Sequence, residues 1–298
     1  MNILITGGTG FIGSELCAML LQQGHYLTII TRSPKQHAEE QAKNQQFISW
    51  DANLTEVMEK ADAVINLVGE NIFGQRWTDE VKERIYSSRI DNTQRLVSAI
   101  KQSEDPPNVM VSASAAGYYG GRGTDVLDEE EPPGKGFLSK VCVDWEKAAA
   151  PVQQAGVRLA IPRIGIVLEK GGGALQKMVP PFKFFVGGPI GRGTQFVPWI
   201  HRHDLCRGLL YPLENEGFEG VYNLNAPNPV TMEELANAIG DVLNRPSAFR
   251  VPEFLLNIVL GEAAKPILES LRVQPKHLQN AGFECRYQKV REALSEIL

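Results

Sequence analysis

The sequence lacks the features that mark membrane and secreted proteins. None of its 298 residues falls in a run of about 18 uninterrupted apolar side chains, the length that a membrane-spanning helix needs. The first five residues include no basic segment and no small-residue cleavage site of a secretory signal. We therefore expect a cytoplasmic protein without a membrane partner.

Basic clusters and metal-binding motifs are also missing. The formal net charge is -5, and lysine and arginine are spread along the chain, so we expect no nucleic-acid partner. His201 and His203 would point to one face of a strand, as metal ligands do, but no third ligand cluster accompanies them, so we predict no metal. No Cys-x-x-Cys pair occurs, which favours buried reduced thiols. The cysteines are Cys17, Cys142, Cys206 and Cys285.

Hydrophobic side chains make up 43% of the chain, enough for a large core, and their pattern predicts alternating strands and helices. Helical patterns follow the first strand and cover residues 78–102 and 139–154. This alternation predicts an α/β fold, a Rossmann doubly wound parallel sheet with helices on both faces. The predicted strands are residues 3–6, 26–31, 47–50, 63–68, 109–113, 157–161 and 221–224.

The second half of the chain changes to loops rich in glycine and proline from Gly171 onward. A capped helix is predicted over residues 231–243, and the end of the chain, residues 253–298, is predicted to be mainly helical. We expect the acidic run at 128–131 to be a solvated loop. The predicted domains are a Rossmann domain over residues 1–165, which also receives later segments, and a smaller mixed α/β substrate domain over residues 166–298.

A glycine motif joins the first strand to its helix. Gly7 permits a tight turn, Gly10 lets the backbone approach a pyrophosphate, and Gly13 lets the helix lie close to the strand. Phosphates would then meet free N–H groups and the positive end of the helix dipole near Phe11 and Ile12. The alternative is a structural turn that binds nothing.

An acidic residue is absent where NAD-binding proteins usually carry one, at the end of the second strand. Thr31, Arg32 and Ser33 stand there instead. A guanidinium can bind a 2′-phosphate with two hydrogen bonds, each worth about 1.5–3 kcal/mol, and a hydroxyl can donate beside it. The sequence therefore predicts NADP(H) as the cofactor, unless Arg32 is only a solvated surface charge.

Several blocks resemble a known family. Residues 6–13 (TGGTGFIG) resemble the glycine loop of the extended short-chain dehydrogenase/reductases, the superfamily of NAD-dependent epimerases and dehydratases. Residues 66–72 (NLVGENI), 114–120 (SAAGYYG), 187–191 (GGPIG) and 198–201 (PWIH) are similar to its branch of SDR39U1-like epimerase family proteins. Residues 273–275 (VQP) and 281–283 (AGF) resemble the helical domain that ends those proteins.

This resemblance implies further cofactor contacts. By it, Leu67, Val68 and Gly69 line the cofactor, Arg89 reaches toward it from the following helix, and Asp51 lies near the adenine. It also implies a smaller domain over the nicotinamide. The alternatives are that the apolar residues are only core and that Arg89 is only a charge on a helix surface.

The catalytic tyrosine of the superfamily is absent. Active members use Tyr-x-x-x-Lys with a serine, and an alignment that keeps Lys140 puts Gly136 at the tyrosine position. An alignment on Tyr119 puts Ala115 at the serine position and Ser114 one residue early, on the opposite face of a strand. Lys140 remains a candidate ligand of the cofactor ribose, unless it is a surface lysine.

The candidate catalytic residues are therefore Ser114, Tyr118 and Lys140. Tyr118 lies after a predicted strand, at the edge of the sheet where ligands bind, but it could equally fill a domain interface. Whether the protein is an enzyme stays open at this point. One hypothesis is an NADP(H)-dependent oxidoreductase or epimerase-like enzyme with a non-standard catalytic centre, and another is a non-catalytic NADP(H) sensor or scaffold. The third is a structural protein without cofactor.

The expected substrate is a small molecule, sugar-like or anionic. Glycine-rich loops at 171–173 and 187–193 could shape its site, and Arg163, Arg192 and Trp199 could hold it. For the oligomeric state, we expect a monomer or a homodimer.

Overall fold

The computed structural model describes residues 1–40, 44–73 and 75–298. Its centre is an eight-stranded sheet in the order β12-β8-β5-β4-β1-β2-β3, with β6 paired to β8, and all of these pairs are parallel. The order reverses between β1 and β4, as in a doubly wound sheet. The strands are β1 (Asn2–Thr6), β2 (Tyr26–Ile30), β3 (Gln45–Ile48), β4 (Ala63–Asn66), β5 (Val109–Ser112), β6 (Ser114–Ala115), β8 (Arg158–Ile164) and β12 (Gly220–Leu224).

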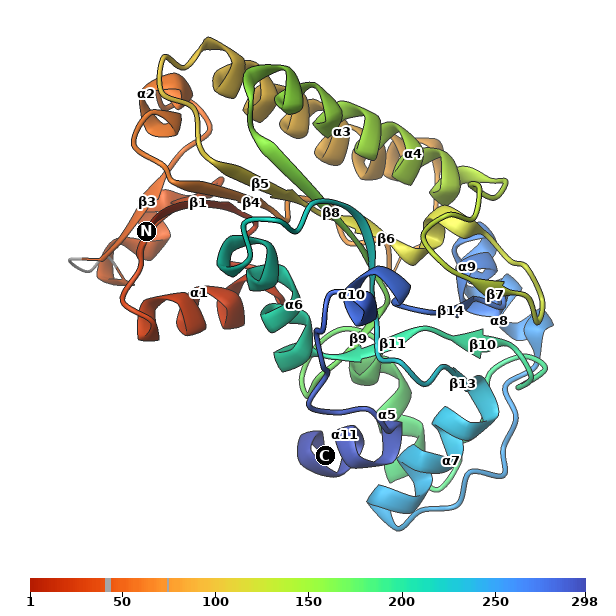
Figure 1. Cartoon of the computed structure of the whole chain (residues 1–298). Coiled ribbons are helices and arrows are strands. Elements are labelled where there is room, and N and C mark those ends of the chain that lie inside the picture. Colours follow the sequence, from red (N-terminus) through yellow and green to blue (C-terminus); the bar gives the residue numbers. More distant parts are fainter. Residues whose placement is uncertain (41–43, 74) are drawn as a thin grey trace.

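Helices cover both faces of this sheet (Figure 1). One face carries α1 (Gly13–Gln22) and α6 (Arg202–Glu214), and the other carries α2 (Leu54–Met58), α3 (Asp79–Gln102) and α4 (Phe137–Ala149). The central strands are apolar because both of their faces are buried, and every residue of β4 and β5 is buried. The predicted α/β Rossmann fold is confirmed.

A smaller region lies beyond the carboxyl ends of the strands (Figure 1). It contains two short sheets, β9 (Ile166–Leu168) with β11 (Trp199–His201) and β10 (Phe196–Val197) with β13 (Val230–Thr231). Three helices, α5 (Leu175–Lys183), α7 (Met232–Leu243) and α11 (Val290–Ile297), enclose a second core around the fully buried Trp199. Helix α7 begins with a capping box between Thr231 and Glu234, as its predicted cap requires.

The C-terminal segment is mainly helical, as predicted. It contains α8 (Glu253–Leu260), the 3₁₀ turn η4 (Gly261–Ala264), α9 (Lys265–Leu268) and α10 (Lys276–Asn280), before α11. One short strand, β14 (Arg272–Val273), pairs with β7 (Val126–Leu127). The domain boundary at residue 165 stays a prediction, since β12 and α6 come after it in sequence and belong to the main sheet and its cover.

Local features differ from the sequence expectations in three places. Thr31 lies just outside β2, and α4 begins at Phe137 and passes directly into the 3₁₀ turn η3 (Ala150–Ala155). Another 3₁₀ turn, η2 (Ala116–Tyr119), follows β6. The expectation of a solvated loop at 128–131 is wrong for Glu129, because its carboxylate accepts from the backbone N–H groups of Asn223 and His277. A further 3₁₀ segment, η1 (Pro34–Glu40), follows β2.

Within the described part of the chain, no helix is long and apolar enough to span a bilayer.

Candidate functional site

The glycine turn has the close contacts that the motif predicts. Gly7 has a φ of +72°, and a Cβ there would lie 2.8 Å from the backbone oxygen of Leu67. A Cβ at Gly13 would lie 2.2 Å from the backbone oxygen of Gly7, closer than any real side chain approaches. The N–H of Gly10 donates to the oxygen of Gly7 at 3.0 Å. Glycine therefore lets β1, the turn and α1 meet without a side chain between them.

The turn leaves backbone donors at the start of α1. Ile12 caps the helix without a side-chain hydrogen bond. Among the described residues, no acceptor takes the N–H of Phe11 or of Ile12. Unsatisfied N–H groups at a helix N-terminus are a binding site for a phosphate or another anion. Because Gly7 touches Leu67 after β4, this site lies where the strand order of the sheet reverses.

The segment after β2 presents an exposed cation beside two hydroxyls. The backbone N–H of Ser33 donates to the Thr31 hydroxyl oxygen at 3.4 Å, which curls the chain at Arg32. The Arg32 side chain is exposed, and it takes part in no hydrogen bond or ion pair with residues that the structure describes. Its guanidinium is therefore available to an incoming anion. Asp51, after β3, is exposed as well.

The loop after β4 is fixed by Arg89. Its guanidinium donates to the backbone oxygens of Glu70, at 3.0 Å, and Ile85, at 2.9 Å. A Cβ at Gly69 would lie 2.9 Å from the Arg89 Cζ, so the glycine makes room for this contact. Burial lowers the pKa of Arg89. The interpretation of Arg89 as a plain surface charge is thus wrong. Leu67 lies beside the glycine turn, and the cofactor contacts of Leu67, Val68 and Gly69 stay a prediction.

A buried polar network, which the sequence does not predict, lies under this loop. The Asn66 side chain accepts from the Thr6 hydroxyl at 2.7 Å and donates to Thr93 at 2.8 Å and Ser112 at 3.1 Å. These residues join the carboxyl ends of β1, β4 and β5 to α3. The only signal in the sequence was an asparagine at the end of an apolar run.

Lys140 lies apart from the other two catalytic candidates and contacts neither Glu146 nor Arg163. Its side chain is 67% exposed, its ammonium is bonded to Asp144 on the same helix, and it lies over the ring of Tyr86. The hydrogen bond to Asp144 raises the pKa of Lys140 and lowers that of Asp144. A role for Lys140 at the cofactor ribose stays a prediction, and it would require this ammonium to leave Asp144.

Ser114 belongs to a buried ion-pair network. Its hydroxyl donates to Glu146 Oε1 at 2.7 Å, and Glu146 also accepts two hydrogen bonds from Arg163, each of 2.9 Å. The Arg163 side chain is 4% exposed and that of Glu146 is 12% exposed. Burial lowers the pKa of Arg163, but the hydrogen bonds and charges of Glu146 and Tyr119 together raise it above its ordinary value, so the guanidinium keeps its proton. Arg163 is therefore paired inside the protein and is not a free substrate ligand.

Tyr118 and Tyr119 lie on either side of this network. The Tyr119 hydroxyl donates to Asn223 Oδ1 at 2.7 Å and accepts from Arg163 at 3.0 Å, and the side chain is fully buried. Burial raises the pKa of Tyr119 to about 12. The Tyr118 ring, half-buried, stacks on the Arg163 guanidinium with 3.3 Å from Cζ to the ring centre. No described residue hydrogen-bonds to the Tyr118 hydroxyl.

Other expected ligands do not converge on the site. Trp199 is buried in the second core and donates to the oxygen of Asn228, and Arg192 is 82% exposed and pairs with Glu253. His201 ends β11 while His203 lies on α6, and His201 Nδ1 accepts from the backbone of His203. The two rings therefore do not share a strand face. No group of three possible metal-binding side chains occurs among residues 1–40, 44–73 and 75–298.

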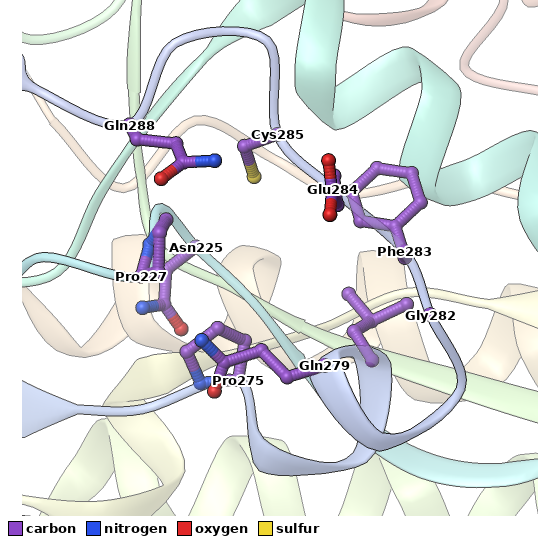
Figure 2. A pocket seen from close by; sticks show the side chains of 10 residues that line it. Asn225, Pro227, Pro275, Gln279, Gly282, Phe283, Glu284, Cys285 and Gln288 are labelled. Atoms are coloured by element: carbon purple, nitrogen blue, oxygen red, sulfur yellow. The ribbon is translucent and has the colours of Figure 1, made fainter.

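A cavity of about 250 Å³ lies near the end of β12 (Figure 2). Prolines, amides and the buried Cys285 surround it, and Glu284 stands on one side. None of its lining residues belongs to the glycine turn or to the network around Arg163. This cavity therefore adds nothing to the candidate site.

Comparison with known families identifies the group to which this arrangement belongs. The model of the NAD dependent epimerase/dehydratase family matches residues 3–224, from β1 to β12. The chain belongs to the NAD-dependent epimerase/dehydratase family. A second model, a domain of unknown function (DUF1731), matches residues 251–297, the segment that carries α8 to α11. The family resemblance of the sequence motifs is thus confirmed over both parts of this epimerase-family chain.

Its relatives are similar along nearly their whole length. The epimerase family protein SDR39U1 homolog, chloroplastic, of Arabidopsis thaliana is 41% identical and covers 100% of this chain and 87% of its own. YfhF of Bacillus subtilis is 37% identical over 100% of this chain and 98% of its own. The crystal structure of human epimerase family protein SDR39U1 with NADPH is 35% identical, with a TM-score of 0.92 over 100% of this chain and 99% of that one.

More distant structures share the fold alone. A UDP-glucuronic acid 4-epimerase from Bacillus cereus matches with a TM-score of 0.79 at 18% identity.

Proposed function

We propose that this protein is an NADP(H)-dependent oxidoreductase or epimerase-like enzyme with a non-standard catalytic centre. The observation that carries the proposal is the pairing of two features at one sheet edge: the glycine turn with its free N–H groups, and the exposed Arg32 after β2. The similarity to a human protein whose structure contains NADPH supports the choice of cofactor.

The residues present fit such a dinucleotide. The N–H groups of Phe11 and Ile12, together with the dipole of α1, would hold the pyrophosphate close to Gly7, Gly10 and Gly13. Arg32 would bind the 2′-phosphate, with the hydroxyls of Thr31 and Ser33 beside it. The loop of Leu67, Val68 and Gly69, fixed by Arg89, would line the rest of the cofactor.

Tyr118 is the proposed acid and base. The bound nicotinamide supplies hydride transfer, and the protein must then move a proton to or from the substrate oxygen. Tyr119 cannot do this readily, because both sides of its hydroxyl are engaged and burial holds its proton. The Tyr118 hydroxyl has no competing partner among the described residues, and its ring is fixed on Arg163. Ser114 acts in this proposal through Glu146, as a positioning residue.

The second candidate is a non-catalytic NADP(H) sensor or scaffold. It is favoured by Gly136, which has a φ of +110° at the tyrosine position, and by the ion pair that holds Lys140 on Asp144. A small substrate, sugar-like or anionic, belongs to the first candidate, and a monomer or homodimer is expected for both. A cytoplasmic location is part of the proposal, although the Arabidopsis relative is named chloroplastic.

Calorimetric titration with NADPH and NADH tests the cofactor. We expect wild-type protein to bind NADPH at least about tenfold more tightly than NADH, since one or two charge-assisted hydrogen bonds are worth that much. Arg32→Ala should remove most of this preference and leave NADH affinity unchanged. Arg291→Ala, an exposed arginine on α11, is the control and should change neither. Tighter NADH binding by the wild type, or an unchanged preference in Arg32→Ala, would contradict the proposal.

A further inference from the structure

The segment after β9, residues 169–174, lies against the glycine turn. We call it the strap. Gly172 in the strap is buried, and a Cβ there would lie 2.2 Å from Cδ2 of the Phe11 ring. A Cβ at Gly173 would lie 3.1 Å from another atom of the same ring. The strap backbone therefore touches the side chain of the residue whose N–H faces the proposed pyrophosphate site.

Arg202, the first residue of α6, ties the strap to this turn. Its Nη2 atom lies 3.2 Å from a carboxylate oxygen of Glu169 in the strap and 3.3 Å from one of Glu15 in α1. Its Nη1 atom donates to the backbone oxygen of Phe11 at 3.4 Å, and the guanidinium carbon lies 5.4 Å from the centre of the Phe11 ring. One guanidinium thus joins α1, the glycine turn, the strap and α6.

The contacts that Arg202 makes with Glu169, Glu15 and Phe11, which we call the junction, are partly buried. The Glu169 side chain is 17% exposed and that of Arg202 is 22% exposed, so solvent screens their attraction only in part. The apolar contact of Gly172 with Phe11 lies next to the ion pair and does not depend on charge. Arg202 Nε is buried with no hydrogen-bond partner among the described residues. The guanidinium is therefore held in place by its terminal nitrogens alone.

We infer that the strap retains the cofactor and that Arg202 and Glu169 are its positioning residues. The inference rests on the proposed NADP(H) site. A pyrophosphate on the N–H groups of Phe11 and Ile12 would lie at the edge of the strap, so the dinucleotide would leave only when the strap moves off Phe11. Loss of the Glu169 contact should then speed release of NADPH and NADH equally, because the strap does not touch Arg32 or the 2′-phosphate.

The test is the rate of NADPH release, measured by stopped-flow displacement of the fluorescent nucleotide from the full chain. Glu169→Gln removes the strap side of the junction, and Glu15→Gln is its matched control on α1. Both variants remove one negative charge that lies within 3.3 Å of the same guanidinium, so the loss of charge at Arg202 is matched. We expect Glu169→Gln to release NADPH about two- to fivefold faster than Glu15→Gln, the range for a partly exposed ion pair.

Gly172→Ala tests the strap without any change of charge. Its Cβ would displace the strap from Phe11, and we expect faster release with an unchanged ratio of NADPH to NADH affinity. If Glu169→Gln does not fold, Gly172→Ala decides the question. Equal release rates in Glu169→Gln, Glu15→Gln and wild type would overturn the inference, as would a release rate in Gly172→Ala equal to that of wild type. Absence of NADPH binding by the wild type would instead refute the proposed function.

Discussion

Two adjacent tyrosines show how the environment of a hydroxyl determines what it can do. The rings of Tyr118 and Tyr119 meet edge to face, with their centres 5.3 Å apart, yet only Tyr119 is bonded to Asn223 and Arg163. A hydroxyl that donates and accepts inside the protein stabilises the fold. A hydroxyl without protein partners remains available to a substrate.

We therefore predict opposite results for the two phenylalanine variants. Tyr118→Phe should reduce single-turnover oxidation of bound NADPH, with a panel of carbonyl substrates, by about 10²- to 10⁴-fold and leave NADPH affinity unchanged. Tyr119→Phe should retain turnover but lower the free energy of unfolding by about 1–3 kcal/mol, because Asn223 and Arg163 lose a buried partner. Full turnover by Tyr118→Phe would exclude this tyrosine as the proton donor.

The residues of the proposed cofactor site could be singled out in the sequence because their signal is local. Gly7, Gly10 and Gly13 act within seven residues, and Arg32 follows a recognisable strand. Glu146 could not be predicted in this way. Its partner Arg163 lies on β8, so their meeting depends on how α4 packs on the sheet. Lys140 was identified by its alignment, but its bond to Asp144 depends on the side chains of its own helix surface.

At the scale of elements, the ion pair between Glu146 and Arg163 joins α4 to β8. The carboxylate also accepts from Ser114 on β6, so one side chain connects three elements at the carboxyl edge of the sheet. Two residues earlier on the same helix, Asp144 pairs with the exposed Lys140. Helix α4 therefore carries one buried and one exposed carboxylate pair, which makes a matched comparison possible.

The buried pair should be much more sensitive to mutation than the exposed one. Glu146→Gln leaves the Arg163 guanidinium buried without a counter-charge, so we expect a loss of about 3–5 kcal/mol in the free energy of unfolding, measured in urea. Asp144→Asn should leave the unfolding midpoint close to that of wild type, because solvent screens Lys140. Equal midpoints for the two variants would show that α4 does not depend on Glu146 for its attachment.

The long strands of the sheet could be predicted from the sequence, but the short strands and the contacts between distant segments could not. Buried parallel strands are nearly continuous apolar runs, so β1, β4 and β5 could be predicted from those runs. The short strands β7 and β14 were missed, since two residues contain no periodicity, and they pair across a separation of more than 140 residues. Glu129 was assigned to solvent because an acidic run says nothing about the backbone donors that the fold brings to it.

Considered as a whole, the molecule buries every one of its cysteines without a disulfide, as the sequence predicted. Burial raises the pKa of Cys17, Cys206 and Cys285 from 9.0 to about 12, and that of Cys142 to about 11. The folded state therefore holds these protons more tightly than the unfolded chain does. The stabilisation is complete below pH 9 and is lost as the pH rises through about 9 to 12, since only the unfolded thiols ionise there.

This predicts a steep alkaline loss of stability. Each thiol should lower the free energy of unfolding by up to about 1.4 kcal/mol for each pH unit above 9, so the four act together. Urea unfolding at pH 8, 9 and 10, with a reducing agent present, measures this slope. Cys285 lies outside the proposed cofactor site. Cys285→Ala should make the free energy of unfolding fall less steeply with pH, by the contribution of one thiol, whatever its effect on stability at pH 8. A slope identical in Cys285→Ala and wild type would mean that this thiol already ionises in the folded protein, because only then would its removal leave the number of protons released on unfolding unchanged.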